Sequence, residues 1–280
     1  MIMSTIVPQW IGRIERFETM RPSSDIDTDN NVWAVTPKYL LRKDCVEHQI
    51  KNWDPAGFVE FGAGTGNFTR IFLDRGFHGI CYDISEANRR TIAANLASYG
   101  DLSVTDNLDD IQGTRHPYII AVEVLEHVED DEQELKLWAS FLSENGKILL
   151  TVPAHQRKFG PDDIQVGHVR RYEKVQLHAL LEKCGFANIT ILNYGFPLGN
   201  LTRTVRNLML RRETHDIDRV DAVELSERSG RSRSQSILKW SFLFRKSVLW
   251  PFLIMQRWTW RLDWGDGYVV TAEKKAHGQS

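Results

Sequence analysis

The amino-acid sequence has few cysteines and almost no excess of charge of either sign, and both absences exclude classes of protein. Its 3 cysteines in 280 residues, Cys45, Cys81 and Cys184, lie too far apart for a disulfide framework or a zinc site. The 35 basic and 37 acidic residues leave a formal net charge of −2, which argues against a dedicated nucleic-acid-binding protein. We therefore expect reduced thiols, a cytoplasmic location and no nucleic-acid partner.

Long hydrophobic runs are absent as well. No window of about 18 residues is both apolar and uncharged, and the closest segment, 237–256, is interrupted by Lys239, Arg245, Lys246 and Pro251. The first residues lack the basic start and apolar run of a secretory signal. The composition, 42% hydrophobic and 26% charged, is that of a globular protein. We do not expect the chain to cross a membrane.

The pattern of apolar, polar and aromatic residues changes along the chain. We interpret residues 1–55 as a helical N-terminal lid, 56–196 as the core, 197–265 as a helical insertion rich in aromatic and basic residues, and 266–280 as the last strand and tail. Short apolar runs alternate with amphipathic stretches in the core, which is typical of a parallel sheet covered by helices. The apolar runs that we interpret as strands lie within 57–64, 76–85, 101–107, 117–125, 146–154, 188–196 and 267–275, and the amphipathic stretches within 67–76, 85–100, 129–146 and 174–186.

A glycine-rich loop, Glu60–Gly66, follows the first of these strands and precedes a helix. Glycines at alternate positions allow the backbone to turn sharply and to lie close against a ligand. A dinucleotide fingerprint would require a third glycine where Asn67 stands, and the loop has no Lys-Ser/Thr pair to bind phosphates. The acidic residue at the start of the loop favours a cationic ligand over a polyphosphate.

These residues resemble motif I of the class I S-adenosylmethionine-dependent methyltransferases, and the order of acidic residues after it is similar too. The resemblance implies a mostly parallel, seven-stranded Rossmann-like sheet. It also implies that Asp83 binds the ribose hydroxyls and that Asp106 accepts a hydrogen bond from the adenine amino group. S-adenosyl-L-methionine is the cofactor implied, with S-adenosyl-L-homocysteine as the product. The implied cofactor-binding residues are Glu60, Gly62, Ala63, Gly64, Gly66, Asp83, Ile84, Asp106, Asn107, Leu108 and Glu123.

Two further segments resemble subgroups of this family. Residues 123–128 (EVLEHV) are similar to the motif after the fourth strand in small-molecule methyltransferases, including the ubiquinone-pathway type. Residues 167–172 (GHVRRY) are similar to a segment of enzymes acting on saccharides and natural products. The resemblance covers about half of the chain. It implies a natural product, saccharide or amino-acid-like acceptor, a place in secondary metabolism, and substrate-binding roles for Tyr39, Arg170 and Tyr172.

Methyl transfer by in-line displacement requires an aligned acceptor and, for a hydroxyl or ammonium group, a proton acceptor. The candidates are His127, as the catalytic base, and His168, which either shares that role or positions the acceptor. His127 also has a structural interpretation, as a capping residue at a helix terminus. We expect no metal ion at the site. For Arg171 we favour pairing with local acids on the surface.

Two alternative functions stay open. In the first, the chain uses the same cofactor without methyl transfer, by cyclisation or by aminocarboxypropyl transfer that releases methylthioadenosine. In the second, the chain binds a nucleoside ligand without catalysis. The aromatic insertion has three interpretations: an appendage that buries its tryptophans, a homodimer interface, or a helix resting on anionic lipid.

Overall fold

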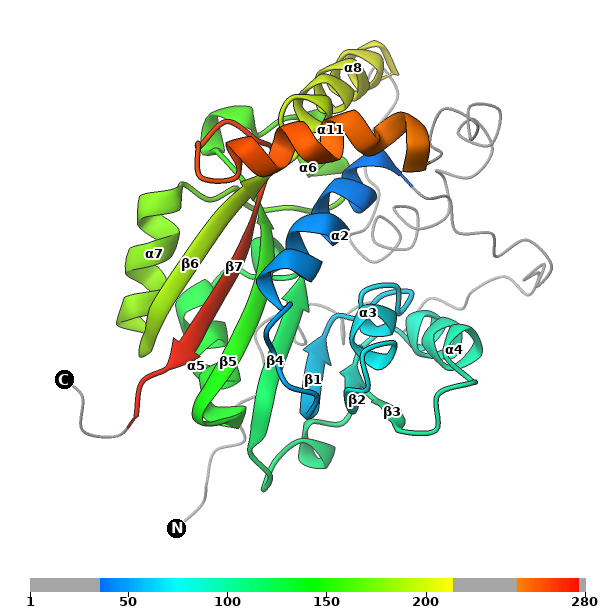
Figure 1. Cartoon of the computed structure of the whole chain (residues 1–280), viewed down its shortest axis with the longest axis vertical. Coiled ribbons are helices and arrows are strands. Elements are labelled where there is room, and N and C mark those ends of the chain that lie inside the picture. The colour runs from blue at the N-terminus through cyan, green and yellow to red at the C-terminus, as the bar shows by residue number, and fades with distance from the viewer. Residues whose placement is uncertain (1–35, 214–245, 277–280) are drawn as a thin grey trace.

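The computed structural model describes residues 36–213 and 246–276. Seven strands form a single sheet in the order β3-β2-β1-β4-β5-β7-β6 (Figure 1). Strands β1 to β5 pair in parallel, whereas β7 runs antiparallel to both β5 and β6. The predicted α/β, doubly wound, mostly parallel sheet is confirmed. The strands are β1 (Gly57–Phe61), β2 (His78–Tyr82), β3 (Leu102–Thr105), β4 (His116–Val122), β5 (Leu142–Pro153), β6 (Phe186–Tyr194) and β7 (Gly267–Lys274).

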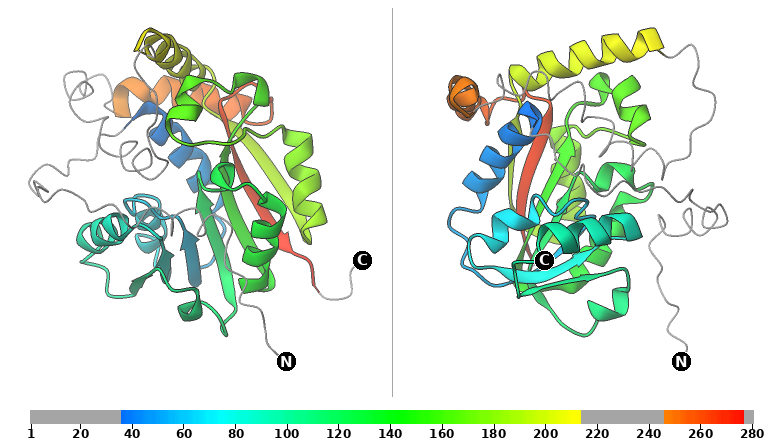
Figure 2. Two further views of the ribbon diagram at one scale, coloured as in Figure 1. Left: turned by 180° about the vertical axis from the view of Figure 1, so that it is seen from behind. Right: turned by 90° about the vertical axis from the view of Figure 1, so that its right-hand side faces the viewer.

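Helices cover both faces of the sheet (Figures 1 and 2) because residues on each strand alternate between two hydrophobic clusters. The helices of the core are α2 (Pro37–Gln49), α3 (Thr69–Leu73), α4 (Glu86–Asn95), α5 (Asp131–Phe141), α6 (Pro161–Gln165) and α7 (Lys174–Lys183), with 3-10 turns η1 (Leu108–Asp110), η2 (Leu125–His127) and η3 (Gln156–Lys158). Val59 and Phe61 pack with α5 and α7, whereas Phe58 packs on the opposite face with α2, α3 and α4.

The insertion lies between β6 and β7, as predicted, and its described part consists of α8 (Leu198–Glu213) and α11 (Lys246–Thr259). Both helices lie at the same end of the molecule as α6 (Figure 1). The predicted polar loop at 226–236 and the aromatic residues at 240, 242 and 244 lie outside the described residues. No helix in the described part of the chain is long and apolar enough to span a membrane.

Two sequence-based predictions differ from the structure in detail. The helix expected over 129–146 ends at Phe141, and β5 begins at Leu142. Asn145 adopts a φ of 58°, outside the right-handed helical region, so the chain turns there before β5 continues. The described part of the lid, α2, buries Leu41, Cys45 and Val46 in the cluster on one face of the sheet, so α2 belongs to the core. Residues 1–35 of the predicted lid lie outside the described residues.

The topology brings the carboxyl ends of β1 to β5 to one edge of the sheet. The strand order reverses at β1, which has β2 on one side and β4 on the other. Ligands of open α/β sheets bind beside such a switch point, outside the carboxyl ends of the strands. The glycine-rich loop follows β1, and Asp83, Asp106 and Glu123 directly or closely follow β2, β3 and β4.

Candidate functional site

The glycine-rich loop after β1 needs its glycines for backbone reasons. Gly62, Gly64 and Gly66 adopt φ values of 65°, 58° and 75°, a region that side chains with a Cβ disfavour. A Cβ on Gly62 would lie 2.7 Å from Cγ2 of Val124, so this glycine also allows β1 and the segment after β4 to approach. A Cβ on Gly64 would have no atom within 4 Å among the described residues. Gly64 therefore exposes its backbone to space that a ligand can occupy.

Asp83 connects the end of β2 to this loop. Its Oδ2 accepts a hydrogen bond of 3.0 Å from the backbone N–H of Gly64, and its Oδ1 accepts one of 3.0 Å from the N–H of Ser85. The side-chain amide of Asn88 donates to both oxygens. Burial raises the pKa of Asp83, although these hydrogen bonds act to lower it. The neighbouring Ile84 is half-buried beside the α5 face of the sheet, so both residues lie beside the loop.

Glu60 is a buried residue of β1 and the first residue of the glycine-rich segment. Its Oε2 accepts a hydrogen bond of 2.6 Å from Oγ1 of Thr69 in α3. Burial raises the pKa of Glu60 to about 8, since the hydrogen bond from Thr69 does not offset the loss of solvation. A cationic group beside Glu60 would restore its charged form.

Residues after β3 lie at the exposed rim of the site. Asp106 forms an ion pair of 2.7 Å with Nη2 of Arg89, and Arg89 also donates to the backbone oxygens of Asp83 and Ile84. Asn107 caps the turn η1 by accepting a hydrogen bond from the N–H of Asp109. Leu108 is partly buried against the α5 face of the sheet. Arg89 thus connects the acidic residues that follow β2 and β3.

Glu123, directly after β4, is held by two cations from α2. Its Oε1 lies 3.1 Å from Nη1 of Arg42, and its Oε2 lies 3.3 Å from Nζ of Lys38. Burial acts to raise the pKa of Glu123, but the charges of Arg42 and Lys38 outweigh it and hold the pKa below its usual range. The hydroxyls of Thr151 and Tyr194 donate to Oε1 at 3.2 and 3.5 Å.

Lys38, Arg42, Thr151 and Tyr194 were not predicted as site residues. Lys38 and Arg42 are four residues apart in sequence, and this spacing indicates two cations on one face of a helix. The sequence contains no signal that pairs them with a carboxylate 81 to 85 positions later. Tyr39, predicted to bind substrate, is buried beside Phe68, and its hydroxyl donates to the backbone oxygen of Asn67.

The structure brings the two candidate histidines together. The ring centroids of His127 and His168 lie 4.8 Å apart, with the rings nearly perpendicular. Nδ1 of His127 lies 3.1 Å from the backbone oxygen of Gly167, and Nδ1 of His168 lies 2.9 Å from Oδ1 of Asp163. Both acceptors require a proton on Nδ1, so Nε2 of each ring carries a lone pair. His127 is exposed at the surface, whereas His168 is half-buried.

Arg170 and Tyr172, predicted to bind substrate, have partners within the protein. Nη1 of Arg170 forms an ion pair of 2.7 Å with Oδ2 of Asp131, and its Nη2 donates to the backbone oxygen of Glu129. Tyr172 is buried, and its hydroxyl donates to the backbone oxygen of Leu125 and to Asp131. These contacts hold the segment between α6 and α7 against the start of α5.

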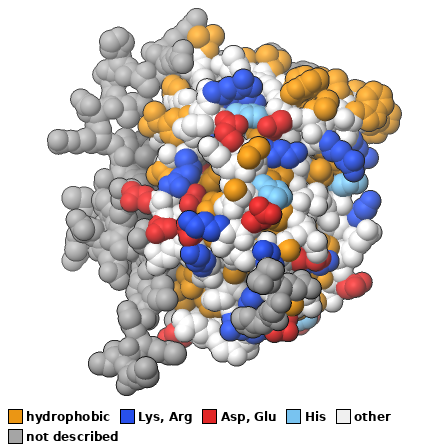
Figure 3. Space-filling view, turned by 90° about the vertical axis from the view of Figure 1, so that its left-hand side faces the viewer, with side chains coloured by type: hydrophobic (Ala, Val, Ile, Leu, Met, Phe, Trp, Pro, Cys, Tyr) orange, Lys and Arg blue, Asp and Glu red, His pale blue; other side chains and the backbone are white. Residues whose placement is uncertain are grey.

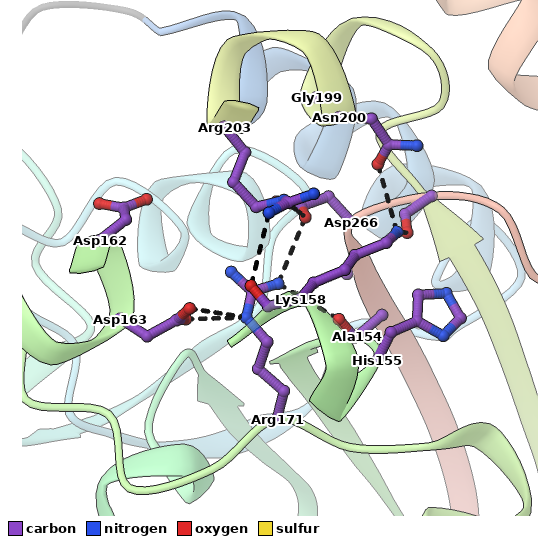
Figure 4. Close-up of polar contacts among 12 residues, drawn as sticks. Ala154, His155, Lys158, Asp162, Asp163, Arg171, Gly199, Asn200, Arg203 and Asp266 are labelled. Atoms are coloured by element: carbon purple, nitrogen blue, oxygen red, sulfur yellow. Dashed lines mark hydrogen bonds and ion pairs between the residues drawn. The ribbon is translucent and has the colours of Figure 1, made fainter. Parts of the chain in front are cut away.

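Arg171 lies in a buried ionic network that connects the core to the insertion (Figure 4). Its Nε lies 2.9 Å from Oδ1 of Asp163, and its Nη1 lies 3.3 Å from Oδ1 of Asp266. Nε of Arg203 in α8 lies 2.7 Å from the same Asp266 oxygen. The predicted pairing of Arg171 with acids is confirmed, but the pairs are buried rather than on the surface. Because Asp163 also binds His168, the network connects α8 to the candidate site.

The described part of the insertion combines buried and exposed apolar residues. Trp260 is buried, as an appendage of the core requires, whereas Trp250 and Trp258 are 62% and 80% exposed. Figure 3 shows hydrophobic side chains gathered toward the end of the molecule at which Figure 1 places α8 and α11. Arg203 and Arg206 of α8 form ion pairs with Asp266 and Asp162.

The fold, a mostly parallel seven-stranded sheet with helices on both faces, is that of the class I methyltransferases. The model of a family described as "Methyltransferase domain" matches residues 44–191, which is more than half of the chain. The chain therefore belongs to this methyltransferase family, and the predicted S-adenosylmethionine-dependent methyltransferase is confirmed. A search of curated proteins found no match.

Solved structures with the same fold include several methyltransferases. A candidate sarcosine dimethylglycine methyltransferase from Galdieria sulphuraria aligns with a TM-score of 0.52 and 13% identity, over 84% of this chain and 86% of its own. Phosphoethanolamine N-methyltransferase 2 from Haemonchus contortus, solved in complex with S-adenosyl-L-methionine, aligns with a TM-score of 0.51 and 15% identity, over 84% of this chain and 53% of its own. At these identities the alignments establish the shared fold.

Proposed function

We propose that the chain binds S-adenosylmethionine at the carboxyl edge of β1 to β4 and methylates a small-molecule acceptor by in-line displacement. The observation that carries this proposal is the hydrogen bond from the N–H of Gly64 to Asp83. It joins the glycine-rich loop after β1 to the acidic residue that follows β2. The open space in front of Gly64 and the buried carboxyl of Glu60 fit a cationic nucleoside ligand. This cofactor supplies an electrophilic methyl group on a sulfonium.

The protein's own residues then have three tasks at the site. Asp83 and Asp106 hold the nucleoside through their carboxylate oxygens, with Ile84, Asn107 and Leu108 beside them. Glu60 accepts hydrogen bonds from the ligand's amino group. Glu123 orients Lys38 and Arg42 through two ion pairs. The negative charge of Glu123 partly offsets the two positive charges at this edge of the sheet.

Methyl transfer to a hydroxyl or ammonium group also requires a residue that takes the acceptor's proton. The available groups are the Nε2 atoms of His127 and His168, because Nδ1 of each ring is already engaged. Burial by the surrounding protein and the neighbouring His168 lower the pKa of His127 to about 4, so its imidazole is neutral at neutral pH although part of the residue is exposed. A pKa this low makes the nitrogen a weak base, so at neutral pH Nε2 of His127 accepts a hydrogen bond or binds a cation more readily than it removes a proton.

Product analysis tests the proposal. The full chain is incubated with isotope-labelled S-adenosylmethionine and a cell extract, and the products are identified by mass spectrometry. We expect S-adenosylhomocysteine together with a labelled small molecule of natural-product, saccharide or amino-acid-like type. Methylthioadenosine as the product would instead establish non-methyl chemistry. Absence of cofactor binding in calorimetry would contradict the proposal altogether.

A further inference from the structure

We propose that Glu126, His127 and His168 form a binding site for one divalent first-row transition-metal ion, although the sequence analysis expected no metal. One ring nitrogen of each histidine and one carboxylate oxygen of Glu126 lie within 4.8 Å of one another. Ligand atoms bound at about 2.1 Å in a tetrahedral arrangement lie about 3.4 Å apart, so each of the three groups needs to move toward the ion by about 1 Å at most. The residues come from η2 and from the loop between α6 and α7, which the backbone hydrogen bond from Val169 to Glu126 holds together.

Glu126 provides an observation independent of this spacing. Its side chain is fully buried, and neither carboxylate oxygen has a hydrogen-bond partner among the described residues. Nε2 of His168, which carries a lone pair, lies 3.6 Å from Oε1, beyond hydrogen-bond distance. A buried carboxylate without partners is costly, and a bound cation is one of the few groups that compensates it.

The surroundings of His168 are those of a metal ligand. Its Nδ1 donates to Oδ1 of Asp163, and this contact leaves Nε2 directed toward Glu126. Asp163 is itself held by Arg171 at 2.9 Å and by the N–H of Gly160 at 2.9 Å. A carboxylate behind a histidine fixes the ring and its tautomer, as in many protein metal sites. The backbone oxygen of Gly167 does the same for His127.

The donor set indicates the class of ion. Two imidazoles and one carboxylate suit zinc, iron, cobalt or manganese, whereas magnesium and calcium prefer oxygen ligands alone. Three protein ligands leave at least one coordination position open. Because His127 is exposed, an ion can reach the site from solvent. A second group, His155, Glu173 and Asp263, has its carboxylates at opposite nitrogens of one ring, which makes a shared ion less favourable.

Metal titration of the full chain tests this inference, with zinc chloride as the probe. After treatment with a chelator and buffer exchange, calorimetry should show one zinc ion bound per chain. Cobalt(II) added to the same protein should give visible absorption bands of a protein-bound ion, and zinc should displace them. Zinc should also raise the melting temperature, on the order of 5 °C at saturation, because it binds only the folded chain.

Variants locate the ion. Glu126→Gln and His168→Ala should each weaken zinc binding by about 100-fold or more. Glu126→Gln replaces a buried carboxyl group that lacks hydrogen-bond partners by an uncharged amide of the same shape. Without metal, the melting temperature of this variant should therefore equal or exceed that of the wild type, and its stabilisation by zinc should be lost. The matched control is His178→Ala, which removes an exposed histidine paired with Glu182 and should bind zinc as the wild type does.

Three outcomes would overturn the inference: no zinc or cobalt binding by the wild type, binding of magnesium alone, or unchanged zinc affinity in both site variants. Calorimetry with S-adenosylmethionine on the metal-free protein is a separate measurement. It should still show binding, so loss of the metal site and loss of the proposed methyltransferase function are distinguishable.

Discussion

Replacement of Glu60 by Gln should reverse a pH-dependent loss of stability. Burial raises the pKa of Glu60 from 4.5 to about 8, so the folded chain holds a proton there that the unfolded chain releases. The contribution of Glu60 to the free energy of unfolding is fully present below about pH 4.5 and is lost as the pH rises through about 8. At about 1.4 kcal/mol per pKa unit, the loss is about 5 kcal/mol at most.

The assay is thermal unfolding of the apo protein between about pH 5 and pH 9. Even half of the maximum, about 2.5 kcal/mol, should give Glu60→Gln a melting temperature roughly 5 to 10 °C above that of the wild type at the alkaline end. The two proteins should converge at the acidic end. The control is Glu144→Gln, at an exposed position, which should follow the wild type throughout. Parallel curves for Glu60→Gln and the wild type would refute the assigned pKa.

Three further predictions concern the same edge of the sheet. Asp83→Ala should cost about 2 to 4 kcal/mol of S-adenosylmethionine affinity in calorimetry, and unchanged affinity would contradict the ribose assignment. Gly64→Ala should lower the melting temperature by a few degrees, since its φ of 58° costs about 1 kcal/mol for a residue with a Cβ, and should also weaken cofactor binding. Arg42→Ala should destabilise the chain by about 3 kcal/mol in denaturant unfolding, because it leaves Glu123 with less compensation, and Arg42→Ala combined with Glu123→Gln should recover part of that loss.

The placement of the candidate site residues at the ends of strands was predictable because it depends on their neighbours in sequence. A glycine that needs a positive φ, as in the loop after β1, is specified within one turn. Asp83, Asp106 and Glu123 each follow an apolar strand, and parallel strands carry such residues to one edge of the sheet whatever the loops between them do. Periodicity alone therefore predicted the seven strands and the position of the insertion.

Contacts between distant segments were decided by the tertiary structure. No local pattern pairs Lys38 and Arg42 with Glu123, or Arg171 with Asp266, since the partners are brought together only when α2 and β7 pack against the sheet. The segment between α6 and α7 lies against η2 and places His168 beside His127, and Glu126 is buried there without hydrogen-bond partners in the described chain. The sequence by itself determined which chemical groups reach the carboxyl edge of the sheet. Their burial, and hence their charge state and their partners, depended on how the loops close over that edge, because solvation is a property of the folded surroundings.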